Sequence, residues 1–135
     1  MNQKLKILLD DATARVQAIE DAQTAEHERR DAQKRERDAA DFKRMVQTNL
    51  GADVLEAIGP VAFVERFLVQ AMTFQIEGQS FRLQQQAGAM VQLEETENKE
   101  FSYRLLGPKF DLAHDEDARS ILLATLRKAL ERRTR

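Results

Sequence analysis

The amino-acid sequence predicts an α+β protein in which a long, charged N-terminal helix precedes a small antiparallel β-meander of three to four strands, covered by a C-terminal helix. Three observations carry this prediction. Residues 10–49 contain neither glycine nor proline, residues 71–86 have the pattern of a hairpin, and residues 115–133 carry an apolar stripe at helical spacing. Seven of the eight aromatic residues lie between positions 63 and 110, which places the expected core in the second half of the chain.

The first fifty residues are expected to form one helical segment, because alanine, glutamate, glutamine, arginine and lysine dominate them. Asp10 or Asp11 can cap the start of the helix, and Asn49 with Gly51 can end it. A helix of that length extends for about 60 Å, more than a small domain can cover. We therefore divide the chain into a helical segment, 1–50, and a small α+β domain, 51–135.

Apolar residues at the beginning of this helix recur at alternating intervals of four and three, which is the seam of a coiled coil. The seam consists of Leu5, Leu9, Ala12, Val16 and Ile19, with Leu8 beside it. The same register continues into polar residues from Gln23 onward, so the hydrophobic seam ends after about two heptads. Between residues 26 and 44 the charges alternate in sign, as on a solvated helix surface.

The hairpin at 71–86 is predicted to turn at Gly78-Gln79 in a type II′ turn, which would pair Ile76 with Phe81 and Phe74 with Leu83. These four apolar side chains would then share one face of the sheet. The preceding run, 61–69, fits a strand or a helix, and we interpret it as a helix because Pro60 suits the first helical position.

A third strand is expected near 89–93 and an acidic loop at 94–100. A fourth strand near 101–106 should place Phe101, Tyr103 and Leu105 against the core and end at Gly107-Pro108. The final helix, 115–133, can begin at Asp115 and cover the apolar face of the sheet.

Composition and motifs give little support to catalysis. The chain has no cysteine and no phosphate-binding loop, dinucleotide fingerprint or nucleophile elbow. His27 and His114 have no partner at metal-ligand spacing, so we expect no metal, cofactor or small-molecule ligand and no enzymatic activity. The apolar stretch before Asp10 is too short for a leader or a membrane span, and we expect a cytoplasmic protein that binds no membrane.

Two functional hypotheses remain. The first is an assembly module that forms a homodimer, or docks on a partner helix, through Leu5, Leu8, Leu9, Ala12, Val16 and Ile19, because exposed large apolar side chains favour burial. The alternative is a nucleic-acid-binding accessory protein that contacts phosphates through two basic clusters. These clusters consist of Arg29, Arg30, Lys34, Arg35 and Arg37, and of Arg127, Lys128, Arg132 and Arg133.

Overall fold

A computed structural model describes residues 2–96, 103–113 and 117–133 of the chain. The chain divides into two compact units, Met1–Arg37 and Asp38–Arg135. Helix α1, Gln3–Leu50, continues through this division. The second unit therefore begins within α1, at Asp38 instead of the expected residue 51, because the last turns of α1 carry core residues.

The first unit is helical from Gln3 onward, and it starts earlier than a cap at Asp10 or Asp11 would allow. Asn2 forms the start instead, since its side-chain oxygen accepts a 2.8 Å hydrogen bond from the backbone N–H of Lys4. The side chains of residues 2–37 are exposed, apart from the half-buried Glu26.

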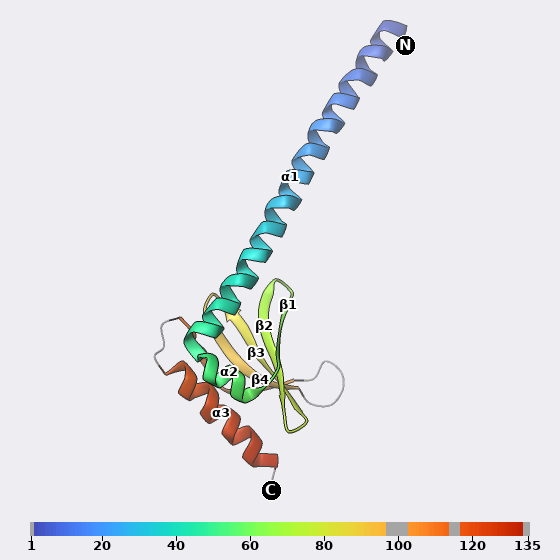
Figure 1. The fold of residues 1–135 in the computed structure, drawn as a ribbon. Coiled ribbons are helices and arrows are strands. Elements are labelled where there is room, and N and C mark those ends of the chain that lie inside the picture. Colours follow the sequence, from blue (N-terminus) through green and yellow to red (C-terminus); the bar gives the residue numbers. More distant parts are fainter. Residues whose placement is uncertain (1, 97–102, 114–116, 134–135) are drawn as a thin grey trace. The chain divides into compact units, whose positions relative to one another are not determined.

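The second unit contains a five-stranded antiparallel sheet in which each strand pairs with the next along the chain (Figure 1). The predicted meander is confirmed, with one more strand than the three to four expected. Its strands are β1 (Val61–Arg66), β2 (Val69–Ile76), β3 (Gln79–Ala87), β4 (Met90–Thr96) and β5 (Tyr103–Asp111).

The segment 61–69 is a strand and a turn, so the helix interpretation was wrong. Val61, Val64 and Phe63 favour extended backbone, and pairing with β2 satisfies their backbone groups. Phe67 and Leu68 form the two-residue turn between β1 and β2, and both have positive φ angles, 52° and 66°.

The β2–β3 hairpin turns one residue earlier than predicted. Glu77 and Gly78 are the central residues, and both have positive φ angles, as a type I′ turn requires. Phe74 consequently pairs with Phe81, and Met72 with Leu83. The predicted pairs were wrong, but the predicted face was right, because the shift in pairing is two residues and side chains alternate with a period of two.

Strands β4 and β5 differ from the prediction in three ways. Glu94 and Glu95, expected in an exposed loop, lie in β4 and are buried. β5 continues through Gly107-Pro108, where its pairing with β4 shifts, because a bulge tolerates proline. Tyr103 and Leu105 are exposed, whereas Leu106 is buried; Phe101 lies outside the described residues.

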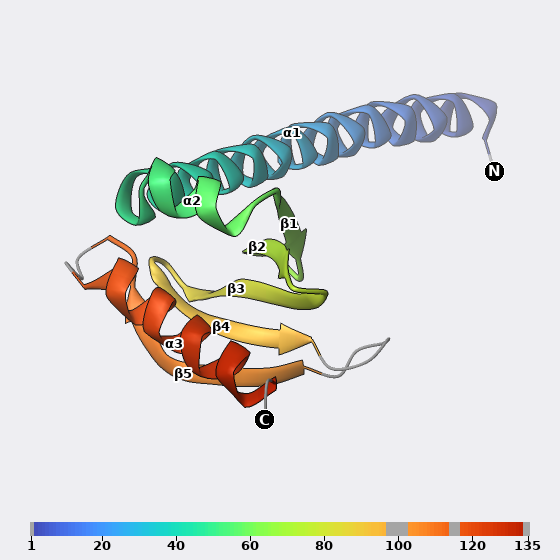
Figure 2. The same ribbon diagram turned by 60° about the horizontal axis from the view of Figure 1, so that its bottom comes forward.

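Three helical segments bury the apolar face of the sheet, which we call the inner face. Helix α2 (Ala52–Ile58) contacts β2, and helix α3 (Ala118–Arg133) packs along β5 (Figure 2). The apolar stripe predicted for the last helix is confirmed, although its expected cap, Asp115, lies outside the described residues. The core of this unit includes Phe42, Val46, Leu50, Val54, Ile58, Met72, Phe74, Phe81, Leu83, Leu93, Leu106, Phe110, Leu122 and Leu126.

The core begins before the second half of the chain, contrary to the prediction from the aromatic residues. Phe42 of α1 is 1% exposed and packs edge-on against Phe63 of β1, with ring centroids 6.3 Å apart. Phe74 and Phe81 stack across the β2–β3 hairpin at 5.6 Å, as expected of core aromatics.

Candidate interaction surfaces

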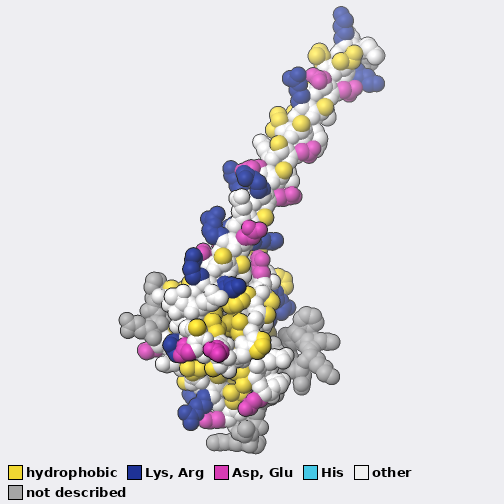
Figure 3. Space-filling model, viewed as in Figure 1, with side chains coloured by type: hydrophobic (Ala, Val, Ile, Leu, Met, Phe, Trp, Pro, Cys, Tyr) yellow, Lys and Arg dark blue, Asp and Glu magenta, His cyan; other side chains and the backbone are white. Residues whose placement is uncertain are grey.

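The predicted seam lies along the first unit as a row of apolar side chains that no other described residue covers. Leu5 and Leu9 are each 48% exposed, Val16 is 53% exposed and Ile19 is 57% exposed. In Figure 3 hydrophobic side chains alternate with charged ones along this helix. Leu8 and Ala12 are also exposed, so all six residues of the predicted interface are available to a partner.

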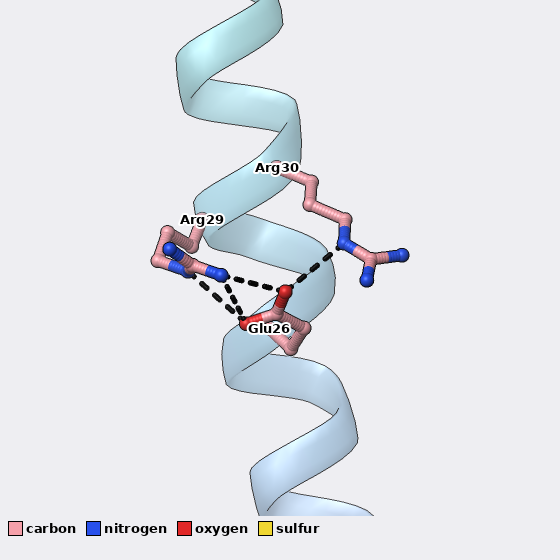
Figure 4. Close-up of polar contacts among 3 residues, drawn as sticks. All are labelled: Glu26, Arg29 and Arg30. Atoms are coloured by element: carbon pink, nitrogen blue, oxygen red, sulfur yellow. Dashed lines mark hydrogen bonds and ion pairs between the residues drawn. The ribbon is translucent and has the colours of Figure 1, made fainter.

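The first basic cluster is partly neutralised within its own helix. Glu26 accepts hydrogen bonds from Arg29 at 2.7 Å and from Arg30 at 3.0 Å, on either side of one carboxylate (Figure 4). His27 lies 3.4 Å from Asp31 and is exposed. Lys34, Arg35 and Arg37 are exposed on the same helix. The ion pair of Glu26 with Arg30, one turn later, agrees with the solvated helix surface expected from the alternating charges between residues 26 and 44.

The second basic cluster lies at the end of α3. Arg127 pairs with Glu131 one turn later at 2.9 Å, and Lys128 and Arg132 are exposed. The side chain of Arg133 lies outside the described residues. The two clusters belong to different units, so each is a separate surface.

A third surface, which sequence reasoning missed, is a groove on the other face of the sheet. We call it the outer groove. It encloses about 480 Å³ and is lined by residues of all five strands and the β1–β2 turn, with no helical residue among those described. Its lining residues are Arg66, Phe67, Val69, Arg82, Gln84, Gln85, Gln86, Gln92, Glu94, Tyr103, Leu105 and Lys109.

An ion pair lies in the floor of the outer groove. Arg82 of β3 donates to Glu94 of β4 from Nε at 2.8 Å and from Nη2 at 2.6 Å. The side chain of Glu94 is only 5% exposed and that of Arg82 only 15%, although the described residues that line this groove belong to strands and one turn alone. The Arg82 guanidinium also lies 5.6 Å from the ring centre of Tyr103, a cation–π contact. Arg82 is thus fixed from two sides.

Gln92, beside this ion pair, has an unsatisfied acceptor. It is 7% exposed, and its Nε2 donates to the backbone oxygen of Gly107 at 3.0 Å. Its Oε1 has no hydrogen-bond partner among the described residues. A buried polar atom without a partner typically costs about 1–3 kcal/mol, so a donor that reaches it would be favoured.

The rim of the outer groove carries two exposed aromatic rings. Phe67 is 86% exposed at the β1–β2 turn, and Tyr103 is 54% exposed on β5. Arg66 lies over the Phe67 ring at 5.3 Å. Of these features, the sequence could have indicated only Phe67, as an aromatic residue in a hairpin turn. The interpretation of 61–69 as a helix prevented that prediction.

Other sites are not found in the described part of the chain. Residues 2–96, 103–113 and 117–133 contain no group of three or more histidine, aspartate or glutamate side chains arranged to hold a metal ion. His114 lies outside these ranges. Among the helices described, none combines the length and the apolar character needed to cross a membrane.

Comparison of the chain with protein-family models, with curated proteins and with solved structures finds no significant match.

Proposed function

We propose that the chain is a non-catalytic assembly module that pairs with a second copy of itself through the seam of its N-terminal helix. One observation carries the proposal: the four large seam side chains, Leu5, Leu9, Val16 and Ile19, are each about half exposed at coiled-coil spacing. Burying such side chains releases about 1.5–3 kcal/mol each when burial is complete. A second helix with the same seam would supply that burial.

A parallel, in-register pair suits the seam best. In that arrangement each of the five apolar layers faces its own copy, from Leu5 to Ile19. An antiparallel pair of the same segment leaves one layer mismatched, with Ile19 against Asn2 or Leu5 against Gln23. The parallel pair also brings Arg15 of one helix beside Glu20 of the other, at flanking positions where opposite charges attract.

The proposed pairing ends near Gln23. Continuing the same register would place Glu26 against its copy and then Arg30 against its copy. Both residues already form ion pairs within their own helix (Figure 4), and close contact between like charges would oppose further pairing. A pair limited to five layers is short, so we expect a weak dimer that dissociates on dilution.

The test measures molar mass by sedimentation equilibrium over a range of protein concentrations. The chain should approach twice its 15.5 kDa mass as concentration rises. The double variant Leu9→Glu/Val16→Glu should remain at 15.5 kDa at every concentration, because each substitution places carboxylates in the seam.

Ile7→Glu is the matched control for the seam variant. Ile7 is 59% exposed on the same helix but lies on the side opposite the seam, so this variant should associate like the unmodified chain. A chain that stays monomeric at high concentration, or an Ile7→Glu variant that dissociates as fully as the seam variant, contradicts self-pairing. In the first case a partner helix of another protein is the remaining occupant of the seam.

Nucleic-acid binding by the two basic clusters remains the alternative proposal, and no specific contact favours it. Arg29, Arg30 and Arg127 each pair with a carboxylate of their own helix. An oligonucleotide mobility shift that weakens with salt and with substitution of Lys34 and Arg37 would support this alternative.

A further inference from the structure

We propose that the outer groove binds a nucleoside phosphate, either free or as part of a single strand. This site is independent of the seam and of the two basic clusters. Three features of the groove lead to it: its net charge, its exposed aromatic rings and its unsatisfied buried amide. Each selects a different part of the ligand.

The charge of the groove favours an anion. The described residues that line it include three cations, Arg66, Arg82 and Lys109, against the single carboxylate of Glu94. The carboxylate of Glu94 accepts hydrogen bonds from Arg82 at 2.6 and 2.8 Å, so these two charges neutralise each other. The net positive charge of the groove then comes from Arg66 and Lys109. The chain as a whole carries a net charge of −2, so this positive excess is local.

The aromatic rings favour a planar ligand. Phe67 and Tyr103 are both exposed on the lining of the groove, and exposed rings on a sheet surface stack well with nucleobases. Arg82 touches Tyr103 and is held in place by Glu94, so the ring is supported by a fixed neighbour. A volume of about 480 Å³ has room for a base, its sugar and one phosphate.

The amide of Gln92 favours a hydrogen-bond donor. Its Oε1 is buried and unpaired, while its Nε2 is fixed by the backbone oxygen of Gly107, so the carbonyl end of the amide remains to be satisfied. Base edges carry such N–H donors. A neutral sugar would also offer donors, but it would leave the charges of Arg66 and Lys109 unused.

The binding experiment uses the full chain with its tyrosine ring isotopically labelled. Tyr103 is the only tyrosine in the sequence, so the label gives one residue's signals by NMR. Adenosine 5′-monophosphate should shift these signals saturably, with at least tenfold tighter binding than adenosine or inorganic phosphate. If a single-stranded oligoadenylate binds at least tenfold more tightly than the mononucleotide, a strand is the ligand. If the two bind with equal affinity, the free nucleotide is the ligand.

Two variants assign the binding to the groove. Gln92→Leu should weaken mononucleotide binding at least fivefold while the midpoint of thermal unfolding changes little, because the variant removes an unsatisfied buried acceptor together with the hydrogen bond from Nε2 to the backbone oxygen of Gly107. A merely structural role would instead lower the midpoint. Lys109→Gln should weaken binding at least threefold, whereas the matched control Lys43→Gln, an exposed lysine of α1 outside the groove and outside both basic clusters, should leave it unchanged.

Three results would overturn the proposal. One is an unmoved Tyr103 signal with every probe at millimolar concentration. Another is adenosine binding as tightly as its monophosphate, which would remove the anionic part of the argument. The third is an equal loss of binding from Lys109→Gln and Lys43→Gln, which would show that the ligand is attracted by positive charge anywhere on the chain.

Discussion

Phe67 and Leu68 occupy backbone conformations that large side chains rarely adopt. Both have positive φ angles in the two-residue turn between β1 and β2, where asparagine and glycine are the favoured residues. Each such angle costs a bulky residue roughly 1–2 kcal/mol. Both side chains are also exposed, at 86% and 66%, so burial offsets little of this cost. Strained, exposed apolar residues of this kind occur at binding surfaces.

Replacing the pair by Phe67→Asn/Leu68→Gly should therefore stabilise the second unit by about 1–2 kcal/mol, because the favoured turn residues remove the strain. Urea unfolding followed by the fluorescence of Tyr103, the only tyrosine in a chain without tryptophan, measures this change. If Phe67 also contacts the nucleoside phosphate, the stabilised variant should bind it more weakly.

The control for this variant is Phe67→Ala/Leu68→Ala, which removes the same apolar side chains but keeps a Cβ at both strained positions. It should gain much less stability than the asparagine–glycine variant. Equal stabilisation by both variants would show that exposed apolar area, and not backbone strain, is responsible.

The outer groove also shows what residue-level sequence analysis misses. Glu94 and Glu95 begin an acidic run, which is typical of a solvated loop, yet both are buried in β4. Their partners are Arg82 and Gln79 of the neighbouring strand. Such pairs depend on strand register, and no local pattern in residues 94–100 contains that information.

At the scale of elements, the sequence predicted which side chains of the β2–β3 hairpin share a face, but it did not predict which residues of the two strands pair. Phe74 and Leu83 lie on the inner face as predicted, because a shift of two residues preserves the alternation. The register depends on whether the turn centres on Glu77-Gly78 or Gly78-Gln79, and both contain a glycine suited to a primed turn. Helix α3 was predictable because its apolar stripe spans four turns.

Asp53, in the first turn of α2, links that helix to α3. The hydrogen bond from the Arg119 guanidinium holds the pKa of the Asp53 carboxyl below its ordinary value. A group with a lowered folded-state pKa stabilises the fold above its unfolded pKa, about 3.9 for aspartate, and this contribution is lost as pH falls through the folded-state pKa.

Asp53→Asn should consequently lower the free energy of unfolding at pH 7, and the difference from the unmodified chain should shrink as the pH falls below about 4. Urea unfolding at several pH values measures this. Arg119→Gln is the matched partner variant, and adding it to Asp53→Asn should cause little further loss. A difference that is constant between pH 3 and pH 7 would contradict the role of this ion pair.

The last turns of α1 contribute to the core of the second unit. Phe42, Val46 and Leu50 recur every fourth residue and are at most 1% exposed, and the same interval continues through Val54 and Ile58 of α2. A chain shortened to residues 38–135 retains all five side chains and should unfold cooperatively. A chain shortened to 51–135 loses three of them, each worth about 2–5 kcal/mol, and should not form a stable fold.

Differential scanning calorimetry distinguishes these shortened chains through the presence or absence of a cooperative transition. As a control for length alone, a chain shortened to residues 28–135 should match the transition of 38–135, because residues 28–37 bury nothing in the structure. A cooperative transition for 51–135 would show that the sheet, α2 and α3 are sufficient without α1.

At the scale of the whole molecule, the seam and the groove differ in how visible they are in the sequence. The seam follows from the spacing of residues within one helix, so its exposed positions could be predicted. The groove needs residues from five strands and one turn to come together, and it depends on a sheet that was predicted one strand short and with a shifted hairpin.

A cysteine cross-link tests the proposed parallel pair directly, because the chain contains no natural cysteine. Ala12→Cys places one thiol at the centre of the seam, where a parallel, in-register pair brings the two copies together. Mild oxidation at a concentration that favours dimer should then give a disulfide-linked dimer on a non-reducing gel. Ala14→Cys is the matched control, since it makes the same substitution on the side of the helix away from the seam and should remain mostly uncrosslinked. Equal cross-linking at both positions would indicate random collision, and a dimer in solution that fails to cross-link through Ala12→Cys would mean that the helices pair in another orientation or register.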